Sequence, residues 1–209
     1  MNTVNLQGQQ IKPSKILCIG RNYVEHIHEL GNEIPEEMVV FIKPNSAITE
    51  QLQASHQNTD LHYESELCFM YQAGQFSAVA LGLDLTKRSL QTQLKSKGLP
   101  WERAKAFDGS AVFSDFVPLS DDMVENLASL ALSLKINDTL IQQGGVELMM
   151  YKPAEILNEL SRFITLEDGD IVMTGTPKGV GKINQGDLFQ GQVTHNNQVI
   201  INHSWQVTG

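Results

Sequence analysis

The sequence predicts an α+β fold that consists mostly of β-strands and forms one domain over residues 1–209. Nine short runs have the composition and the flanking turn residues of strands, whereas only three segments have helical signals. Strands do not alternate regularly with long helices, so a Rossmann sheet or a TIM barrel is disfavoured. No repeat, low-complexity block or Pro/Ser-rich linker divides the 209 residues, which favours a single domain.

The predicted strands follow one another along the whole chain. They are residues 15–19, 38–42, 61–71, 76–83, 131–136, 139–143, 171–174, 188–193 and 198–207. Asn137-Asp138 and Asn196-Asn197 each separate two neighbouring strands. Because these residue types tolerate positive φ, both pairs of strands are predicted to be hairpins with tight turns.

Three short helices are predicted beside the strands. They are residues 23–30, 86–97 and 153–163. Gly98 and Pro100 follow the second helix, as is typical of a helix end, and Pro153 opens the third, where proline suits the first turn. The first helix has the weakest signal, and the loop 31–37 that follows it is predicted to be mobile.

Charge and hydropathy exclude several classes of partner. Fifteen Lys and Arg against 24 Asp and Glu give a net charge of −9, which repels nucleic acid and anionic lipid. Apolar runs such as 16–19 and 78–81 are too short to span a membrane. The polar start lacks a secretory signal, and Cys18 and Cys68 lie in apolar stretches that suit buried free thiols. The sequence therefore predicts a cytoplasmic protein.

The strand 61–71 carries two carboxylates on one face. Alternation along a strand places Glu64 and Glu66 together with His62, at about 6 to 7 Å from one residue to the next on that face. Asp84 follows at the end of the next predicted strand. Three carboxylates without a Cys/His cluster favour Mg²⁺, Mn²⁺ or Ca²⁺ over Zn²⁺. The alternatives are a solvated strand face for the glutamates and a helix N-cap for Asp84.

Seven patterns, two of which contain these carboxylates, follow one another along the chain. They are GRNY at 20–23 with His26 and Glu29, FIKP at 41–44, YESEL at 63–67, LDLT at 83–86 with Arg88 and Gln91, GLPW at 98–101 with Lys105, LEDGD at 166–170, and TGTPKGVG at 174–181. Together they resemble the fumarylacetoacetate hydrolase family, and in particular its small acylpyruvate hydrolase branch. The resemblance covers most of the chain.

The resemblance implies a fold, a cofactor and a reaction. The fold is a mixed β-roll or partly open barrel with a few short helices, usually in a homodimer. A divalent cation, Mg²⁺ or Mn²⁺, is held by Glu64, Glu66 and Asp84. The substrate is a 2-oxo acid, and the implied reaction is hydrolysis of an acylpyruvate or related β-diketo acid to pyruvate and a carboxylic acid.

The resemblance also implies roles for individual side chains. His26 and Glu29, three apart on a predicted helix, are implied to activate water, with a surface ion pair as the alternative. Lys105 is implied to lie near the substrate carboxylate or the developing oxyanion, with a surface lysine as the alternative. Substrate positioning or support of the site is implied for Arg21, Arg88, Gln91 and Thr176. The glycines of TGTPKGVG let backbone amides approach an anion, and the loop 31–37 is implied to close over the substrate.

Some positions depart from the family pattern and leave other functions open. Ser89 stands where the family commonly has Asp, and residues 108–113 and 144–146 are atypical. One alternative uses the same site for oxaloacetate decarboxylation or tautomerisation, or for isomerisation of 2-hydroxyhepta-2,4-diene-1,7-dioate. A second alternative is a catalytically inactive module that binds a small molecule.

Overall fold

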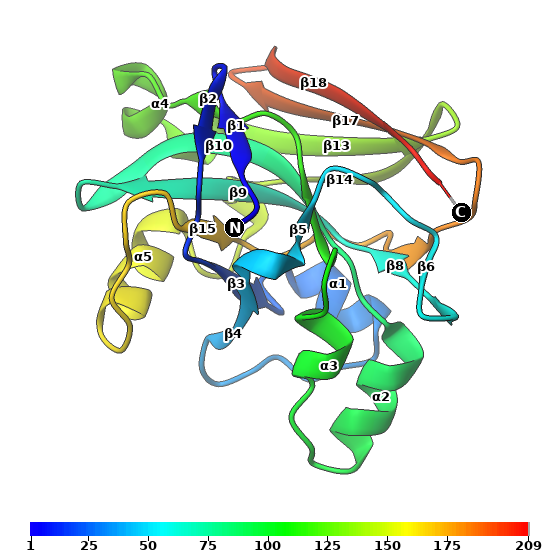
Figure 1. Ribbon diagram of the computed structural model, residues 1–209. Coiled ribbons are helices and arrows are strands. Elements are labelled where there is room, and N and C mark those ends of the chain that lie inside the picture. The colour runs from blue at the N-terminus through cyan, green and yellow to red at the C-terminus, as the bar shows by residue number, and fades with distance from the viewer. Residues whose placement is uncertain (209) are drawn as a thin grey trace.

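The computed structural model describes residues 1–208 and is dominated by strands (Figure 1). The strands are β1 Val4–Leu6, β2 Gln9–Ile11, β3 Lys15–Gly20, β4 Val39–Pro44, β5 Ile48–Thr49, β6 Ser55–His56, β7 Thr59–Asp60, β8 His62–Tyr63, β9 Ser65–Gln72, β10 Gln75–Asp84, β11 Ala111–Phe113, β12 Val117–Pro118, β13 Leu130–Ile136, β14 Thr139–Gly145, β15 Ile171–Met173, β16 Gly181–Lys182, β17 Leu188–His195 and β18 Gln198–Gln206. The helices are α1 Val24–Glu29, α2 Arg88–Ser96, α3 Glu102–Lys105, α4 Asp121–Glu125 and α5 Pro153–Ser161.

The largest sheet is mixed and has the order β4-β3-β15-β9-β10-β11-β5, with β12 also paired to β10. The pairs β3/β15 and β11/β5 are parallel, and the other pairs in this sheet are antiparallel. Its two longest strands, β9 and β10, are strongly curved and cross the middle of the molecule (Figure 1). This curved mixed sheet with five short helices agrees with the predicted β-rich α+β fold.

A second sheet packs over the first. Its order is β14-β13-β17-β18, and all its pairs are antiparallel. The two predicted hairpins are present here: Asn137 and Asp138 have φ of 49° and 66°, and Asn196 and Asn197 have φ of 49° and 63°. A Cβ on Gly191 of β17 would lie 2.0 Å from Leu81 of β10, so glycine at 191 is required for this close approach of the sheets.

The main sheet is covered on both faces. Leu67 and Phe69 of β9 point into a core shared with the second sheet. Cys68 and Met70 of the same strand point into a second core on the opposite face, where Figure 1 shows the β1–β2 hairpin and β5. Burial on both faces makes β9 a central strand, and its residues from Ser65 to Met70 are all buried.

All nine predicted strands and three predicted helices have counterparts, with one correction. The run 61–71 is divided into β8 and β9 with a break at Glu64. The solvated-face alternative is wrong, because Glu64 and Glu66 are only 7% and 2% exposed. The N-cap alternative for Asp84 is also wrong, because α2 begins at Arg88 with Lys87 in the N-cap position.

Two other expectations can be compared with the structure. Cys18 and Cys68 are buried free thiols, as predicted. Among residues 1–208, no helix combines the length and apolarity that a membrane span requires.

Candidate active site

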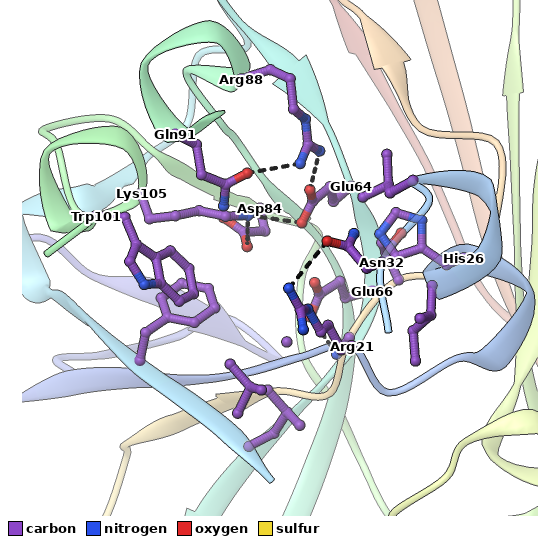
Figure 2. Close-up of a pocket in the computed structure, with 18 of the residues that line it drawn as sticks. Arg21, His26, Asn32, Glu64, Glu66, Asp84, Arg88, Gln91, Trp101 and Lys105 are labelled. Atoms are coloured by element: carbon purple, nitrogen blue, oxygen red, sulfur yellow. Dashed lines mark hydrogen bonds and ion pairs between the residues drawn. The ribbon is translucent and has the colours of Figure 1, made fainter. Parts of the chain in front are cut away.

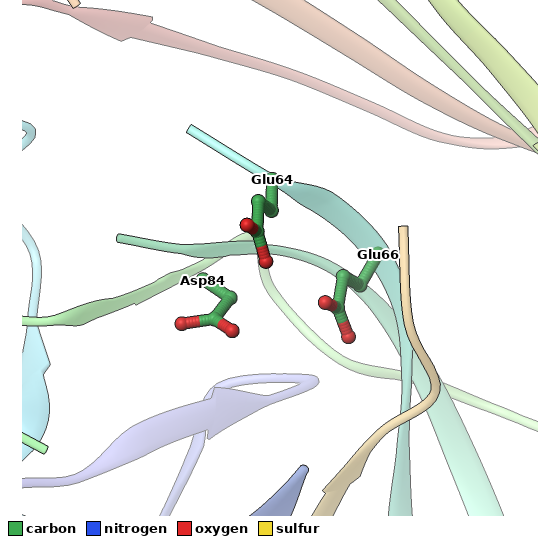
Figure 3. Close-up of side chains that lie close together, drawn as sticks. All are labelled: Glu64, Glu66 and Asp84. Carbon is green, nitrogen blue, oxygen red and sulfur yellow. The ribbon is translucent and has the colours of Figure 1, made fainter. Parts of the chain in front are cut away.

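Three carboxylates meet where β9 begins and β10 ends. The two strands pair antiparallel in this region, and the amide of Asp84 donates to the carbonyl of Glu64 over 2.9 Å. One carboxylate oxygen from each of Glu64, Glu66 and Asp84 lies within 4.8 Å of the others, and the side chains converge in Figure 3. The alternation predicted for Glu64 and Glu66 therefore directs both side chains into the same cluster.

The electrostatics of this cluster suit a hard cation. Burial and the neighbouring charges of Asp84 and Glu64 raise the pKa of Glu66 well above its ordinary value. Burial would also raise the pKa of Glu64, but the cations Lys105 and Arg88 hold it well below its ordinary value. A divalent ion would remove the mutual repulsion, and a set of carboxylate oxygens without sulfur or nitrogen matches Mg²⁺, Mn²⁺ or Ca²⁺. The residues present therefore fit a divalent cation.

Two buried lysines contact the carboxylates directly. Lys105, at the end of α3, donates from Nζ to Glu64 Oε2 over 2.7 Å and to Asp84 Oδ2 over 2.5 Å. Lys43, on β4, lies 2.8 Å from Asp84 Oδ1 and also donates to the carbonyl and hydroxyl of Ser110 over 3.0 Å. The surface-lysine alternative for Lys105 is wrong, because only 3% of this residue is exposed.

Arg88 and Gln91 support the same cluster from α2. Arg88 forms an ion pair with Glu64 and donates to Gln91 Oε1 over 2.9 Å (Figure 2). Ser89 is exposed on the same helix. Ser89 lacks the carboxylate that the family commonly has at this position, but Glu64 and Gln91 still hold the Arg88 guanidinium.

The predicted His26–Glu29 pair is formed on α1. His26 Nδ1 lies 3.0 Å from Glu29 Oε2, and the backbone amide of Gly179 donates to Glu29 Oε1 over 2.9 Å. His26 is 6% exposed and lines the cavity, which excludes the surface ion pair alternative. With Nδ1 bonded to Glu29, Nε2 is the ring nitrogen left for a substrate.

The loop after β15 holds the carboxylates of Glu66 and Glu29 through its backbone amides. Gly175 donates its amide hydrogen to Glu66 Oε2 over 2.7 Å, and Gly179 donates to Glu29. The anions expected near these two glycine amides are therefore carboxylates of the protein itself. Gly175 has φ of 95°, and a Cβ on Gly179 would lie 2.2 Å from the carbonyl oxygen of Ile141. Both positions therefore require glycine.

Thr176 and Gln142 link this loop to β9. The Thr176 hydroxyl donates to the Ser65 carbonyl over 2.8 Å and accepts from Gln142 Nε2 over 2.9 Å. Gln142 Oε1 accepts from the Ser65 amide over 3.0 Å. The atypical Gly144 lets β14 come close enough for these bonds, because a Cβ there would lie 2.8 Å from Pro177.

Arg21 approaches the cavity from the corner after β3. Its φ of 56° is unusual for a residue with a side chain. The guanidinium donates to Asn32 Oδ1 over 3.1 Å and to the Glu33 carbonyl over 3.4 Å, so Arg21 connects the cavity to the predicted lid loop 31–37. Asn22 anchors this corner by donating to the carbonyls of Tyr151 and Thr174 over 3.0 and 2.9 Å.

One cavity brings the predicted residues together. Nine of the ten predicted side chains line it: Arg21, His26, Glu64, Glu66, Asp84, Arg88, Gln91, Lys105 and Thr176. Glu29 contacts it through His26. Sequence reasoning missed Lys43, although the FIKP pattern contains it, and Lys95, which lies one helical turn after Gln91. It also missed Gln142, for which no local pattern gives a signal.

The chain is similar to one protein family and to several proteins with named activities. Residues 15–201 match the model for the fumarylacetoacetate (FAA) hydrolase C-terminal domain. Oxaloacetate tautomerase YcgM of Escherichia coli (strain K12) is 38% identical over 188 residues, with 83% of this chain and 85% of that protein covered. Oxaloacetate tautomerase FAHD1, mitochondrial, of Homo sapiens is 37% identical over 192 residues, with 85% and 86% covered.

Solved structures have the same fold. Fumarylpyruvate hydrolase from Pseudomonas aeruginosa in complex with Mn²⁺ and pyruvate has a TM-score of 0.87 at 30% identity, with 99% of this chain and 95% of that chain covered. Yeast ynq8, described as a fumarylacetoacetate hydrolase family protein, has a TM-score of 0.80 at 32% identity, with 95% and 94% covered.

Proposed function

Because the chain belongs to the fumarylacetoacetate hydrolase family, we propose that this enzyme interconverts the keto and enol forms of oxaloacetate with Mg²⁺ or Mn²⁺ bound. The observation that carries the proposal is the His26–Glu29 pair, in which the buried His26 lines the same cavity as the three carboxylates. The similarity to two oxaloacetate tautomerases supports this substrate, and the Mn²⁺ complex of the related hydrolase supports a divalent cation.

The carboxylates would supply the electrophilic part of the site. A divalent cation held by Glu64, Glu66 and Asp84 would polarise the carbonyl of a 2-oxo acid and make loss of a neighbouring proton easier. Lys105 and Arg88 keep Glu64 ionised and therefore ready to act as a ligand. Lys43 forms an ion pair with one oxygen of the Asp84 carboxylate and so fixes the position of that group.

His26 would move the proton. Conversion of keto to enol removes a proton from C3 of oxaloacetate and places a proton on the oxygen at C2, so no atom is gained or lost. Glu29, itself held by the Gly179 amide, orients the imidazole so that Nε2 can accept the proton and later return it. Closure of the loop 31–37, tied to Arg21 through Asn32, would exclude bulk water from this step.

A direct assay tests the proposal. Purified protein with Mg²⁺ or Mn²⁺ is mixed with enol oxaloacetate, and loss of the enol absorbance is compared with the uncatalysed rate and with a sample containing EDTA. We expect a metal-dependent acceleration that His26→Ala reduces by about 10² to 10⁴-fold. A rate equal to the uncatalysed one with both ions would contradict the proposal.

Hydrolysis of acylpyruvates, the main function implied by the sequence patterns, is the second candidate. It is favoured by the fold of the fumarylpyruvate hydrolase with bound pyruvate and by a His–Glu pair that could activate water as well as move a proton. Incubation with acetylpyruvate, with release of pyruvate as the readout, separates the two. Pyruvate release without any change in the enol absorbance of oxaloacetate would favour hydrolysis.

A homodimer and a cytoplasmic location are further proposals. The homodimer rests on the family resemblance and on strand edges that a second copy could cover. The location rests on two buried free cysteines, which are typical of a reducing compartment. Light scattering and cell fractionation test them, and a monomer mass or a secreted protein would contradict them.

A further inference from the structure

The cavity contains more positive charge than its carboxylates can balance. Four cationic side chains and three carboxylates line it. Two of the cations, Arg88 and Lys105, are paired with the carboxylates. Among residues 1–208, Arg21 and Lys95 form no ion pair within 4.0 Å, and Arg21 donates only to an amide and a carbonyl oxygen. A bound divalent cation would add to this positive charge. The cavity therefore favours an anion with more than one negative group.

Lys95 stands at the outer part of this space. It follows Gln91 by four residues on α2 and therefore shares its helix face. Lys95 is exposed, whereas Gln91 and the three carboxylates are buried. Lys95 therefore belongs to the solvent-exposed part of the cavity lining.

An aromatic pair lies between Lys95 and the buried lysine of the site. Lys95 Nζ lies 4.7 Å from the centre of the Trp101 ring, and the Trp101 and Phe41 rings are 5.1 Å apart between centres. Lys105 Nζ lies 5.3 Å from the centre of the Phe41 ring. The two rings form an apolar wall that keeps the ammonium groups apart and limits the positions that the Lys95 side chain can take.

We propose that Lys95 binds the second carboxylate of a dianionic 2-oxo acid whose 2-oxo end lies at Glu64, Glu66 and Asp84. The assignment rests on the proposed function and extends it, because it explains how the site distinguishes a dicarboxylate such as oxaloacetate from a monoanionic acylpyruvate. Partial removal from water and the nearby cations Arg21 and Lys105 lower the pKa of Lys95 to about 8. A carboxylate between these cations would relieve the repulsion that destabilises them.

The test compares one-carboxylate and two-carboxylate ligands in charge variants of Lys95. Lys95→Gln removes the charge, Lys95→Arg keeps it, and Lys97→Gln removes a lysine of the same helix end that does not line the cavity. Isothermal titration in the presence of Mn²⁺ measures binding of pyruvate and of difluorooxaloacetate, a dianionic 2-oxo acid without a C3 proton. The KM for oxaloacetate is measured in parallel.

We expect Lys95→Gln to weaken difluorooxaloacetate binding and raise the KM for oxaloacetate by about tenfold or more. Pyruvate binding should change by less than about twofold, because it has no second carboxylate, and Lys95→Arg and Lys97→Gln should resemble the original protein. Equal weakening of both ligands, or unchanged binding of the dianion, would overturn the assignment, as would a protein that binds neither ligand. If oxaloacetate is not tautomerised, the proposed function fails, but the titration still decides the role of Lys95.

Discussion

Replacement of Asp170 by Asn should lower the free energy of unfolding by about 2 to 4 kcal/mol. Asp170 is fully buried directly before β15, and both its oxygens are bonded. Oδ1 accepts from the amide and hydroxyl of Ser14 over 3.1 and 2.7 Å and from the amide of Lys15 over 3.1 Å. Oδ2 accepts from Lys15 Nζ over 2.5 Å and from the amide of Glu167 over 2.9 Å. These bonds tie the start of β3 to the start of β15.

The magnitude follows from what asparagine can replace. Its oxygen can face Ser14, but its amide nitrogen must then face the two donors Lys15 Nζ and Glu167 N. Two hydrogen bonds are lost, and one of them is to an ammonium group, for which a contribution of about 1.5 to 3 kcal/mol is typical. The side chain of Lys15 is 17% exposed, so water can hydrate its ammonium group in the variant. The expected loss in the free energy of unfolding therefore stays near the lower end of the range for breaking a buried ion pair.

The loss should depend on pH in a defined direction. Burial would raise the pKa of Asp170, but hydrogen bonds from Glu167, Lys15 and Ser14 hold it below its ordinary value. A depressed folded-state pKa contributes stability that is present above the unfolded-state pKa of about 4 and is lost as the pH falls toward the folded value. The difference between the original protein and Asp170→Asn should therefore be full at neutral pH and shrink below about pH 4.

Urea unfolding, followed by far-UV circular dichroism, measures this loss. Asp168→Asn is the matched control, because Asp168 is exposed two residues away and accepts one bond from the Ala73 amide over 2.8 Å. The control should lose at most about 1 kcal/mol. Equal losses in the two variants, or a loss in Asp170→Asn that does not change between pH 7 and pH 3, would refute the argument.

Three further outcomes are expected. Glu66→Gln should weaken Mn²⁺ binding at least tenfold in a titration while the fold is kept, because a neutral amide replaces an anionic oxygen ligand; unchanged affinity would remove Glu66 from the ligand set. Glu29→Gln should slow enol conversion by about 10²-fold or more without changing Mn²⁺ affinity, and loss of the metal instead would contradict a role in proton transfer. Gly179→Ala should slow the reaction in the same way, because its Cβ would displace the loop whose amide holds Glu29; an active variant would show that this bond is dispensable.

The longer elements were predictable because their signals are local. Alternation, turn residues and helix ends fixed the nine strand positions and three helices to within a few residues. The prediction missed short pieces such as β5, β8 as a separate strand, and β16, each of two residues. Such strands depend on a partner that is distant in the sequence, as β5 does on β11. Two residues are also too few to show the alternation of apolar and polar side chains that indicates a strand.

The candidate site was predictable where its residues lie in short patterns. Glu64 and Glu66 are two apart on one strand, and His26 and Glu29 are three apart on one helix, so local geometry brings each pair together. Lys43 could not be found in this way, because it meets Asp84 only through the fold. Its strand β4 pairs with β3 and not with β10, and a lysine in a strand has no pattern that indicates complete burial.

The register of β9 connects the core to the site. Leu67 and Phe69 fill one core, whereas Glu66 shares its face with Cys68 and Met70, which fill the other. A shift of one residue relative to β10 would exchange the two faces and turn Glu66, together with Glu64, away from Asp84. Each large apolar side chain on this strand contributes about 1.5 to 3 kcal/mol through burial, so two packed faces oppose the shift. The core can therefore hold three carboxylates together despite their repulsion, which is the arrangement that a divalent cation requires.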